Sequence, residues 1–493
     1  MKPIIKICLF NPIPVNSYPP LNLTYLASYL REYGKYDYEI KLVDSNFSDS
    51  PVKEIVDFQP DIIGFTSLSS YSLEIYDKAK LIRKECPDAL LICGGVHATI
   101  NPGEVVKEGG FDIAVVGEGE ETFRDIVDSR VQSNNDLSPD LLSLIRGIAY
   151  IKDSEVHINP PRELIEDLDS IPHPARELLN NRAYHNHSYI TRGINTFGVY
   201  TIVGSRGCPY HCIFCCVNFT NPGKVRYHSP SYIADEVEEL IVKYHGRWLF
   251  FTDDTFFINK ESTRQLCKLL IERGFHKKIK WEVQIRSNLI REDDLELLRL
   301  MKEAGCRQID IGFESGNQRV LTLIKGGGIT VEDHQRAIDL VNLAGIKVMG
   351  TFIIGTPTET YQEMLETKCF IERNFDKLHR FQVCCATPYP GTRLYEMCVD
   401  KGLISKNYLE ELLWEKEHNI EAMLRVFSDQ VDKDTVLKLR MELDNLSFRK
   451  IRLSEKIRWF FFNLVKNKKV LLAGIGWVLS RVFYRNLSER KKQ

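Results

Sequence analysis

At the centre of this chain stands the stretch Gly207-Cys208-Pro209-Tyr210-His211-Cys212-Ile213-Phe214-Cys215, whose three cysteines have the spacing C-x3-C-x2-C. The stretch directly follows a short apolar run at 199–203. Three thiolates on one tight loop can each bind one iron of a four-iron cluster, whose usual complement is four cysteines. The motif therefore predicts a cluster with one iron left open to a reacting molecule.

A zinc knuckle is the alternative use of clustered cysteines. It needs a second Cys/His pair at zinc spacing, and the residues that follow Cys215 carry none. Gly207 lets the backbone approach a cluster closely, and Pro209 favours an extended conformation at Cys208. We therefore favour the iron cluster over zinc.

The cysteine loop resembles the cluster loop of the radical S-adenosylmethionine (radical SAM) superfamily, which has the signature C-x3-C-x-aromatic-C. The resemblance implies that Cys208, Cys212 and Cys215 bind a 4Fe-4S cluster. It also implies that the amine and carboxylate of SAM chelate the open iron, with Phe214 near the adenine. An enzyme that reductively cleaves SAM is the expected class.

Length and composition describe a globular protein of several domains. The 493 residues suggest about three domains, and 43% hydrophobic with 27% charged residues excludes a disordered chain. The net charge of -2 gives no overall attraction to nucleic acid. Thirteen cysteines without a disulfide rhythm are typical of a reducing cytosol. No signal peptide and no apolar run long enough for a membrane span is recognisable, so we expect a cytoplasmic protein.

Strands and helices alternate through the first part of the chain. Apolar runs at 4–10, 39–43, 62–66, 90–93 and 113–116 are separated by segments of helical periodicity such as 23–33 and 73–85. This alternation predicts an N-terminal doubly wound parallel sheet of about five strands over residues 1–140. Ligands of such sheets bind at the carboxyl ends of the strands.

Those predicted strand ends carry glycines and hydroxyl groups, which suit either a ligand site or ordinary turns. Their order, ahead of the cysteine loop, resembles the cobalamin-binding domain of one large radical SAM subgroup, the class B methyltransferase-like proteins. The resemblance implies cobalamin contacts at Thr66, Ser67, Leu68, Gly94, Gly95, Gly117 and Glu118.

The chain departs from other cobalamin proteins in one motif. The D-x-H-x-x-G motif that supplies a lower axial histidine is absent, and Asn11-Pro12-Ile13-Pro14-Val15-Asn16-Ser17-Tyr18 follows the first predicted strand instead. Radical SAM members of the family commonly lack that histidine. We expect cobalamin to bind without a protein imidazole, and we expect His97 to face solvent or pack in its loop.

A connector is predicted at 141–190. Runs at 147–151 and 155–158 indicate a hairpin, and Ile171-Pro172-His173-Pro174 indicates an extended crossing between two domains.

A second strand and helix alternation at 191–403 resembles the radical SAM core, which implies a partial (β/α) barrel with SAM contacts at its strand ends. Asp254 is the expected partner of the SAM ammonium group. Arg286 suits the SAM carboxylate or ribose, and Glu314 and Ser315 suit the ribose hydroxyls or the amine. Gly355 belongs to a strand that resembles the one against adenine. Cys216, Cys384 and Cys385 are interpreted as small packing residues.

The region 404–493 is predicted to be helical, with a basic and aromatic tail from Ser447. Residues 447–493 hold thirteen Lys or Arg and two Glu. Cations interleaved with Trp and Phe favour a segment lying on the inner face of an anionic membrane, and a helical pair packed on the barrel is the alternative. No recognisable nucleic-acid module accompanies the tail, which argues against RNA binding.

The leading hypothesis is a cobalamin-dependent radical SAM methyltransferase that acts on a carbon of a small, lipid-like substrate. An oxidative cyclase or rearrangement enzyme with the same cofactors is the runner-up. A methylthiotransferase and a cofactor sensor are further alternatives. A flavodoxin or ferredoxin-type protein is the expected electron donor.

Overall fold

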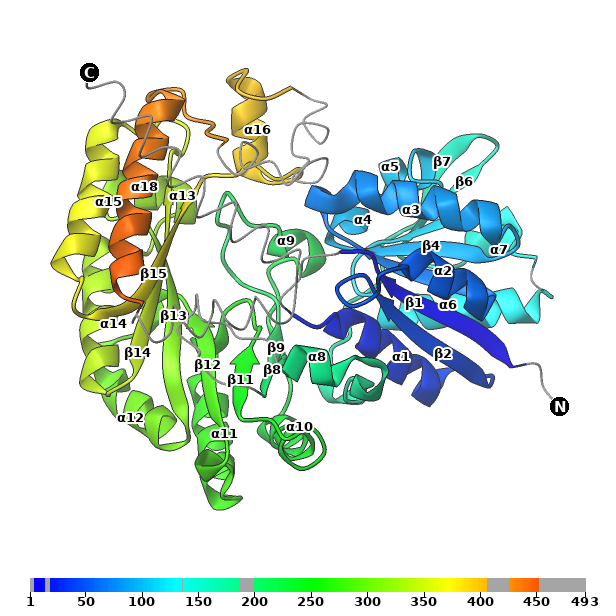
Figure 1. Ribbon diagram of the computed structural model, residues 1–493, viewed down its shortest axis with the longest axis horizontal. Helices are drawn as coiled ribbons and strands as arrows, with labels where there is room; N and C mark the ends of the chain where they lie inside the picture. Colours follow the sequence, from blue (N-terminus) through cyan, green and yellow to red (C-terminus); the bar gives the residue numbers. More distant parts are fainter. Residues whose placement is uncertain (1–3, 14–17, 135, 186–197, 406–424, 452–493) are drawn as a thin grey trace.

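The computed structural model describes residues 4–13, 18–134, 136–185, 198–405 and 425–451. Two α/β units lie side by side, and the short helix α9 (Val217–Thr220) lies between them (Figure 1). The first unit contains the N-terminus, and the second is an open half-barrel.

The first unit contains a seven-stranded sheet in the order β2-β1-β3-β4-β5-β6-β7. Strands β1 to β5 pair in parallel, which confirms the predicted doubly wound sheet. The strands are β1 (Ile5–Asn11), β2 (Tyr38–Asp44), β3 (Ile62–Ser67), β4 (Leu90–Gly95), β5 (Ile113–Val115), β6 (Ile148–Lys152) and β7 (Glu155–Ile158).

Helices cover both faces of this sheet, which explains why its strands read as continuous apolar runs. Along β1, Ile7 and Leu9 pack into one core cluster, and Cys8 and Phe10 pack into the cluster on the other face. The helices are α1 (Leu21–Tyr33), α2 (Pro51–Phe58), α3 (Ser72–Glu85), α4 (Val96–Ile100), α5 (Pro102–Lys107), α6 (Glu120–Gln132) and α7 (Pro139–Leu142).

The hairpin predicted within the connector is present as β6 and β7. It does not stand apart from the first domain, because β6 pairs antiparallel with β5 and so extends the sheet beyond residue 140. The rest of the connector, which ends in the described part with α8 (Asn181–His185), packs on α1 through Leu168, Ile171 and Leu179 and also contacts the second unit. There the Arg176 side chain donates to the backbone oxygen of Thr201 and to the Glu236 carboxylate.

The second unit contains six parallel strands in the order β15-β14-β13-β12-β11-β8. Consecutive parallel strands joined by helices form the partial barrel that the sequence predicts. The strands are β8 (Val199–Ile202), β11 (Trp248–Phe251), β12 (Lys280–Ile285), β13 (Cys306–Glu314), β14 (Lys347–Ile354) and β15 (Leu378–Cys385). A short hairpin of β9 (Ser205–Arg206) and β10 (Arg226–Tyr227) flanks the cysteine loop.

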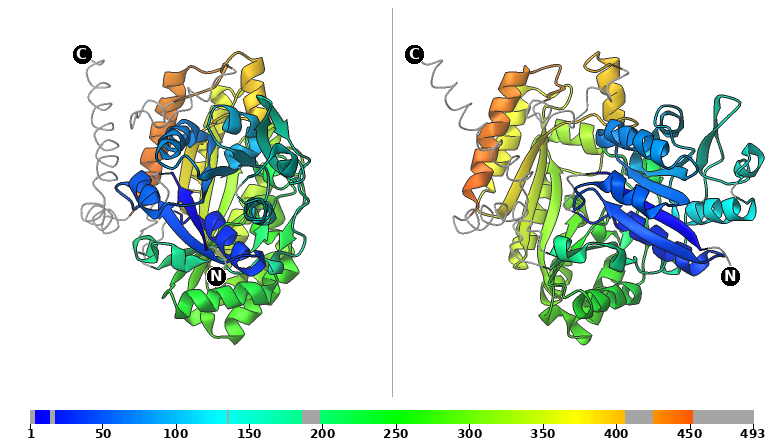
Figure 2. Two further views of the ribbon diagram at one scale, coloured as in Figure 1. Left: turned by 90° about the vertical axis from the view of Figure 1, so that its right-hand side faces the viewer. Right: turned by 45° about the vertical axis from the view of Figure 1, so that its right-hand side comes forward.

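Helices form the outer layer of the half-barrel (Figure 2). They are α10 (Pro230–Val242), α11 (Lys260–Glu272), α12 (Leu295–Glu303), α13 (Gln318–Lys325), α14 (Val331–Leu343), α15 (Tyr361–Arg373) and α18 (Lys433–Arg449). Helix α16 (Arg393–Asp400) lies instead at the top of the half-barrel (Figure 1), where its Leu394 and Cys398 share an apolar cluster with Phe214. Helix α18 packs on the edge strand β15, and its Val436, Leu439 and Leu443 are buried in the barrel core. It therefore covers the edge strand on its outer face.

One aromatic contact joins the two units close to the chain start. The Tyr18 ring, which precedes α1, stacks on Phe250 of β11 with ring centroids 5.4 Å apart. Val199 and Trp248 complete this small cluster. The loop that follows β1 therefore reaches across to the half-barrel.

The basic tail lies outside the described residues from 452 onward. Within the described ranges, no helix combines the length and the apolar character that a membrane span requires.

Candidate active site

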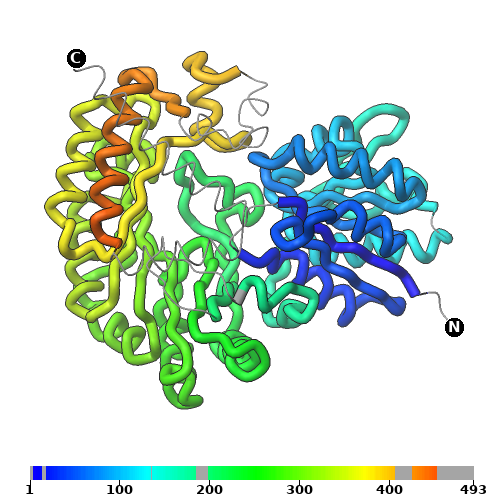
Figure 3. Tube along the Cα trace, viewed as in Figure 1, coloured from blue at the N-terminus to red at the C-terminus, as the bar shows by residue number. Residues whose placement is uncertain are grey.

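The cysteine loop lies between the two units, where the chain path crosses from the half-barrel toward the first sheet (Figure 3). Gly207 begins the loop with a φ of +98°. A Cβ atom there would lie 2.0 Å from the backbone oxygen of Lys224. Only glycine fits this position, where the backbone of the segment just before β10 lies close to the base of the loop.

Two of the three cysteines lie within hydrogen-bonding distance of side chains that follow strands β11 and β12. Thr255 Oγ1 lies 3.4 Å from Cys208 Sγ, and Arg286 Nη1 donates to Cys212 Sγ at 3.2 Å. Burial raises the pKa of Cys215 to about 12, and the neighbouring Cys212 and Cys208 add to the rise. The three thiols therefore lie around a common volume.

A site for one metal ion and a site for a four-iron cluster make different demands on the arrangement of ligands. Among the described side chains, no three Cys, His, Asp or Glu residues form a group that could hold one metal ion. A four-iron cluster sets a different requirement, because each thiolate binds its own iron.

The second half of the cysteine loop is fixed to the half-barrel on two sides. The N–H of Ile213 donates to the carbonyl of Ile324 at 2.9 Å, and its carbonyl accepts from the N–H of Leu394 at 2.8 Å. Phe214 packs against an apolar cluster that includes Ala386 and Leu394. The aromatic side chain therefore points toward the end of β15.

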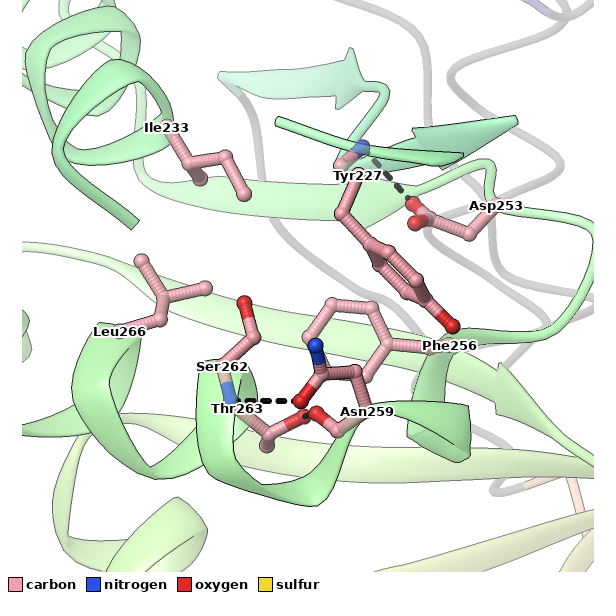
Figure 4. A pocket seen from close by; sticks show the side chains of 9 residues that line it. Tyr227, Ile233, Asp253, Phe256, Asn259, Ser262, Thr263 and Leu266 are labelled. Carbon is pink, nitrogen blue, oxygen red and sulfur yellow. Dashed lines mark hydrogen bonds between the residues drawn. The ribbon is translucent and has the colours of Figure 1, made fainter. Parts of the chain in front are cut away.

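Two neighbouring carboxylates after β11 hold the first half of the loop. Asp253 accepts a hydrogen bond from the backbone N–H of Gly204 at 3.0 Å (Figure 4) and another from the hydroxyl of Ser205 at 2.5 Å. Asp254 accepts from the backbone N–H of Gly207 at 2.9 Å. Both aspartates therefore fix the approach to Cys208.

Complete burial dominates the electrostatics of Asp253 and raises the pKa of its carboxyl to about 7. Beside it, Tyr227 and Asn259 line a cavity of about 20 Å³ (Figure 4). That volume suits about one water molecule. Asp253 therefore lies on this small cavity, whereas Asp254 borders a separate cavity of about 310 Å³.

The other predicted SAM contacts lie around the barrel rather than on the large cavity. Arg286 is bound to Cys212 and to the carbonyl of Lys325 at 3.0 Å, and its guanidinium stacks on Tyr210 at 4.1 Å. Glu314 has a φ of +63° and lies 3.3 Å from Lys325 Nζ. These charges surround the Cys212 side of the loop.

Ser315 and Gly355 directly follow β13 and β14. The Ser315 hydroxyl is buried, accepts from the Asn317 N–H at 3.1 Å and lies 3.2 Å from Thr367 Oγ1. Gly355 has a φ of +74°, and a Cβ there would lie 3.1 Å from a methyl carbon of Val436 in α18. Both residues shape the turns at the ends of β13 and β14.

At the first sheet, the predicted cobalamin loops form a close-packed edge. Gly95 has a φ of +96°, and a Cβ there would lie 2.8 Å from the backbone oxygen of Ser67. Ser67 Oγ donates to the carbonyl of Gly94 at 2.7 Å, and Thr66 Oγ1 accepts from the Asn22 amide at 2.8 Å. Leu68 is 37% exposed. The glycines therefore leave backbone uncovered where side chains would stand.

A cavity of about 310 Å³ lies at this edge and extends to the second unit. It is lined by Gly94, Gly95, Gly117 and Glu118 of the first sheet and by Ser205, Arg206, Thr252 and Asp254 of the second unit, together with residues of α1 and α6. Thr66, Ser67 and Leu68 are not among its lining residues. On the first sheet its lining residues come from β3, β4 and β5 and from the loop that follows β5, at the carboxyl edge where ligands of doubly wound sheets bind.

Among the residues that the structure describes, no histidine lines this cavity. His97 is fully buried in α4, with Nε2 2.7 Å from the Tyr76 hydroxyl and Nδ1 3.1 Å from Ser69 Oγ. Both ring nitrogens are therefore engaged, which agrees with a packing role and differs from exposure to solvent.

Several residues that border the site were not predicted from sequence. Arg206, Arg226 and Lys325 form ion pairs with Glu118, Glu118 and Glu314 respectively. Arg206 stands directly before the cysteine loop, and that position was an available signal. Arg226 and Lys325 carry no local signal, because only the tertiary fold brings them to the site.

Comparisons with known proteins divide the chain into the same two units. The family model for the radical SAM superfamily matches residues 202–371, and the model for the B12 binding domain matches residues 14–127. An uncharacterized methyltransferase of Pyrococcus horikoshii is 33% identical over 424 residues, which cover 84% of this chain and 85% of the relative.

Two further similarities extend the comparison. The anaerobic magnesium-protoporphyrin IX monomethyl ester cyclase of Cereibacter sphaeroides is 28% identical over 78% of this chain and 61% of its own length. The solved structure of the radical SAM methyltransferase TsrM from Kitasatospora setae, with cobalamin and a [4Fe-4S] cluster, has a TM-score of 0.66 and 18% identity. That match covers 80% of this chain and 75% of TsrM, and it shows a shared fold. The chain therefore belongs to the radical SAM superfamily, in the group whose members carry a B12-binding domain ahead of the radical SAM domain.

Proposed function

We propose that this protein is a cobalamin-dependent radical SAM methyltransferase that transfers a methyl group to a carbon of a small-molecule substrate. The observation that carries the proposal is the cavity shared by the two units. Its lining includes Gly95 and Gly117 from the B12-binding side and Asp254, which holds the backbone of Gly207 beside the first cysteine. A ligand at the edge of the first sheet would therefore face the cysteine loop.

The residues of the loop fit a 4Fe-4S cluster. We assign Cys208, Cys212 and Cys215 as ligands of one iron each, which would leave the fourth iron open to SAM. The Arg286 N–H on Cys212 Sγ would stabilise negative charge on that ligand, as hydrogen bonds to cluster sulfurs do. When bound, the cluster supplies the electron for SAM cleavage, and cobalamin carries the methyl group.

The SAM contacts are assigned to residues that surround the loop. Asp254 would accept the SAM ammonium group, because its carboxylate lies beside Gly207 at the mouth of the cavity. Arg286 and the Glu314 carboxylate would orient the remaining polar groups, and Phe214 would lie near adenine. We assign Ser315 and Gly355 to the turns that hold these groups, because the Ser315 hydroxyl is already engaged.

The B12-binding side fits cobalamin without a protein imidazole. Gly94, Gly95 and Gly117 leave the sheet edge open to a flat ligand, and Glu118 borders the same cavity. Thr66, Ser67 and Leu68 would act at the rim, by holding the loop that Gly95 packs against. Neither nitrogen of His97 is available as a ligand.

The relatives support methyl transfer as the function, and they also support a second candidate, oxidative cyclisation. The relative with 33% identity is named a methyltransferase, whereas the relative with 28% identity is named a cyclase. An oxidative cyclase would use the same cofactor sites and yield no methylated product.

One experiment separates the two functions. The protein is reconstituted anaerobically with iron, sulfide and hydroxocobalamin, desalted, and treated with reductant and SAM. We expect stoichiometric cobalamin to accept a methyl group, detected by its absorbance spectrum and by formation of S-adenosylhomocysteine. Protein that binds cobalamin and releases 5'-deoxyadenosine, but forms neither methylcobalamin nor S-adenosylhomocysteine, would contradict the methyltransferase proposal and favour the cyclase.

The finer points of the proposal concern the membrane and the electron donor. The composition of residues 447–493 supports peripheral contact with an anionic membrane, and with it a lipid-like substrate. We expect the full chain to co-sediment with anionic liposomes and a chain ending at residue 446 to stay in the supernatant. Equal sedimentation of the two chains would contradict the proposed membrane contact and remove the basis for a lipid-like substrate. A flavodoxin or ferredoxin would supply the electron.

A further inference from the structure

A network of buried ion pairs joins the B12-binding side to the base of the cysteine loop. Glu118 Oε1 accepts from Arg206 Nη1 at 2.9 Å, and the same carboxylate accepts from Arg226 at 2.8 and 2.9 Å. Glu120 Oε1 accepts from Arg206 Nη2 at 2.6 Å. Two carboxylates thus face two guanidinium groups across the boundary between the units.

The network is nearly closed to solvent. The side chains of Arg226, Glu120 and Glu118 are 3%, 7% and 9% exposed, and that of Arg206 is 16% exposed. Burial alone would raise the pKa of Glu118, but hydrogen bonds from Arg226 and Arg206 hold it below its usual value. Loss of one partner would leave an unpaired buried charge and strongly destabilise the folded protein. The ion pairs therefore hold the segment that contains Glu118 and Glu120 against the β9–β10 hairpin.

Each partner stands next to a cofactor segment. Glu118 and Glu120 alternate with Gly117 and Gly119, all four of which line the shared cavity. Arg206 directly precedes Gly207, whose close approach to Lys224 fixes the start of the cysteine loop. Arg226 pairs with Arg206 in the β9–β10 hairpin. A displacement of either cofactor segment therefore moves the other.

We propose that Glu118 and Glu120 are positioning residues that couple the two cofactor sites, so that cluster assembly on the cysteine loop tightens cobalamin binding at the sheet edge. The proposal rests on the proposed function. Coupling between sites is reciprocal, so bound cobalamin also stabilises the assembled cluster loop. Glu118 acts through the arginines and not as a direct cobalamin ligand, because Arg206, Arg226 and the N–H of Ile165 already occupy its carboxylate.

The test measures the dissociation constant of hydroxocobalamin by anaerobic absorbance titration, once without the cluster and once after reconstitution. In the wild type we expect the cluster to tighten binding about tenfold, within the range of typical allosteric couplings. In Glu118→Gln, which keeps the shape of the side chain but removes its charge, we expect the ratio of the two constants to fall close to one.

Glu166→Gln is the matched control. It removes another ion pair, between the connector and the segment just before β10, in which Lys224 Nζ lies 2.5 Å from Glu166, without touching the loop that contains Glu118. We expect this variant to keep the wild-type ratio. Glu118→Asp, which keeps the charge, should recover part of the coupling that Glu118→Gln loses.

The outcomes distinguish the two proposals. A wild type that binds no cobalamin contradicts the proposed function, and the coupling falls with it. A wild type that binds cobalamin equally well with and without the cluster contradicts only the coupling, as does Glu118→Gln with an unchanged ratio. If Glu118→Gln does not fold, Glu120→Gln serves instead, because it leaves both Arg226 bonds in place, and an unchanged ratio there contradicts the role of Glu120.

Discussion

Replacement of Gly207 by alanine tests whether the backbone at the start of the cysteine loop controls cluster binding. The new Cβ would lie 2.0 Å from the backbone oxygen of Lys224. Favourable contacts of carbon lie near 3.5 Å, so the two segments would have to separate by about 1.5 Å. The carbonyl belongs to the backbone, so no side-chain rotation relieves the overlap.

The loss of folding free energy in Gly207→Ala has two contributions. An L-residue at positive φ costs about 1–2 kcal/mol, and overpacking adds about 1–3 kcal/mol. Gly223→Ala is the matched control, because Gly223 has a φ of +68° and nothing lies within 4 Å of its added Cβ. The control therefore meets only the first contribution, and the two variants should differ by about 1–3 kcal/mol.

The assay compares iron and sulfide content per chain after anaerobic reconstitution, together with thermal unfolding of each variant. We expect Gly223→Ala to bind iron close to the wild-type stoichiometry and Gly207→Ala to bind well under half of it, with both variants still folded. Wild-type iron content in Gly207→Ala would refute the reasoning, because it would mean that the loop tolerates the separation without losing its cysteine geometry.

Three further predictions test other parts of the site. Arg286→Lys keeps a positive charge but loses the fork that reaches Cys212 Sγ, the Lys325 carbonyl and the Tyr210 ring. We expect the reduction potential of the reconstituted cluster to fall in this variant, and an unchanged potential in redox titration would speak against the Arg286–Cys212 bond. His97→Asn should weaken the fold by about 1–3 kcal/mol in denaturant titration, because Tyr76 and Ser69 lose partners. Its EPR spectrum of one-electron-reduced cobalamin should match that of the wild type and show no nitrogen splitting in either protein; splitting that disappears in the variant would identify His97 as a ligand. Asp253 has a folded-state pKa of about 7, raised by burial above its unfolded value, so the wild type should lose stability as pH rises from about 4 to 7. Asp253→Asn cannot ionise, so its unfolding free energy, measured at pH 5 and pH 8, should rise relative to the wild type by a few kcal/mol over that interval, and a constant difference would contradict the assignment.

The order of strands and helices could be predicted because the apolar periodicity is local. The parallel strands are buried on both faces, so residues 7–10 form one continuous apolar run. Such a run predicts a strand without any knowledge of the rest of the fold. The hairpin at 148–158 was also recognisable, but its membership of the first sheet depends on pairing with β5, which no local pattern encodes.

The candidate site was predictable in part, for the same reason. The cysteine spacing and the glycines at the strand ends are local signals. The roles of charged residues are not local. Glu118 looks like a ligand contact in sequence, yet its carboxylate is occupied by Arg226, which is more than one hundred residues away along the chain. Two carboxylates in a row after β11 likewise do not reveal that Asp253 is buried and Asp254 borders the cavity.

The stacking of Tyr18 on Phe250 has a consequence for the order of events on the ribosome. The first sheet is complete in the nascent chain long before β11 is synthesised, yet the loop after β1 finds its partner ring only in that strand. The partner follows about 230 residues later, which at ordinary rates of translation is a delay of roughly 10–50 s. During that interval the loop has no barrel to dock on, so a chaperone that shields the loop would act on the nascent chain before the second half emerges.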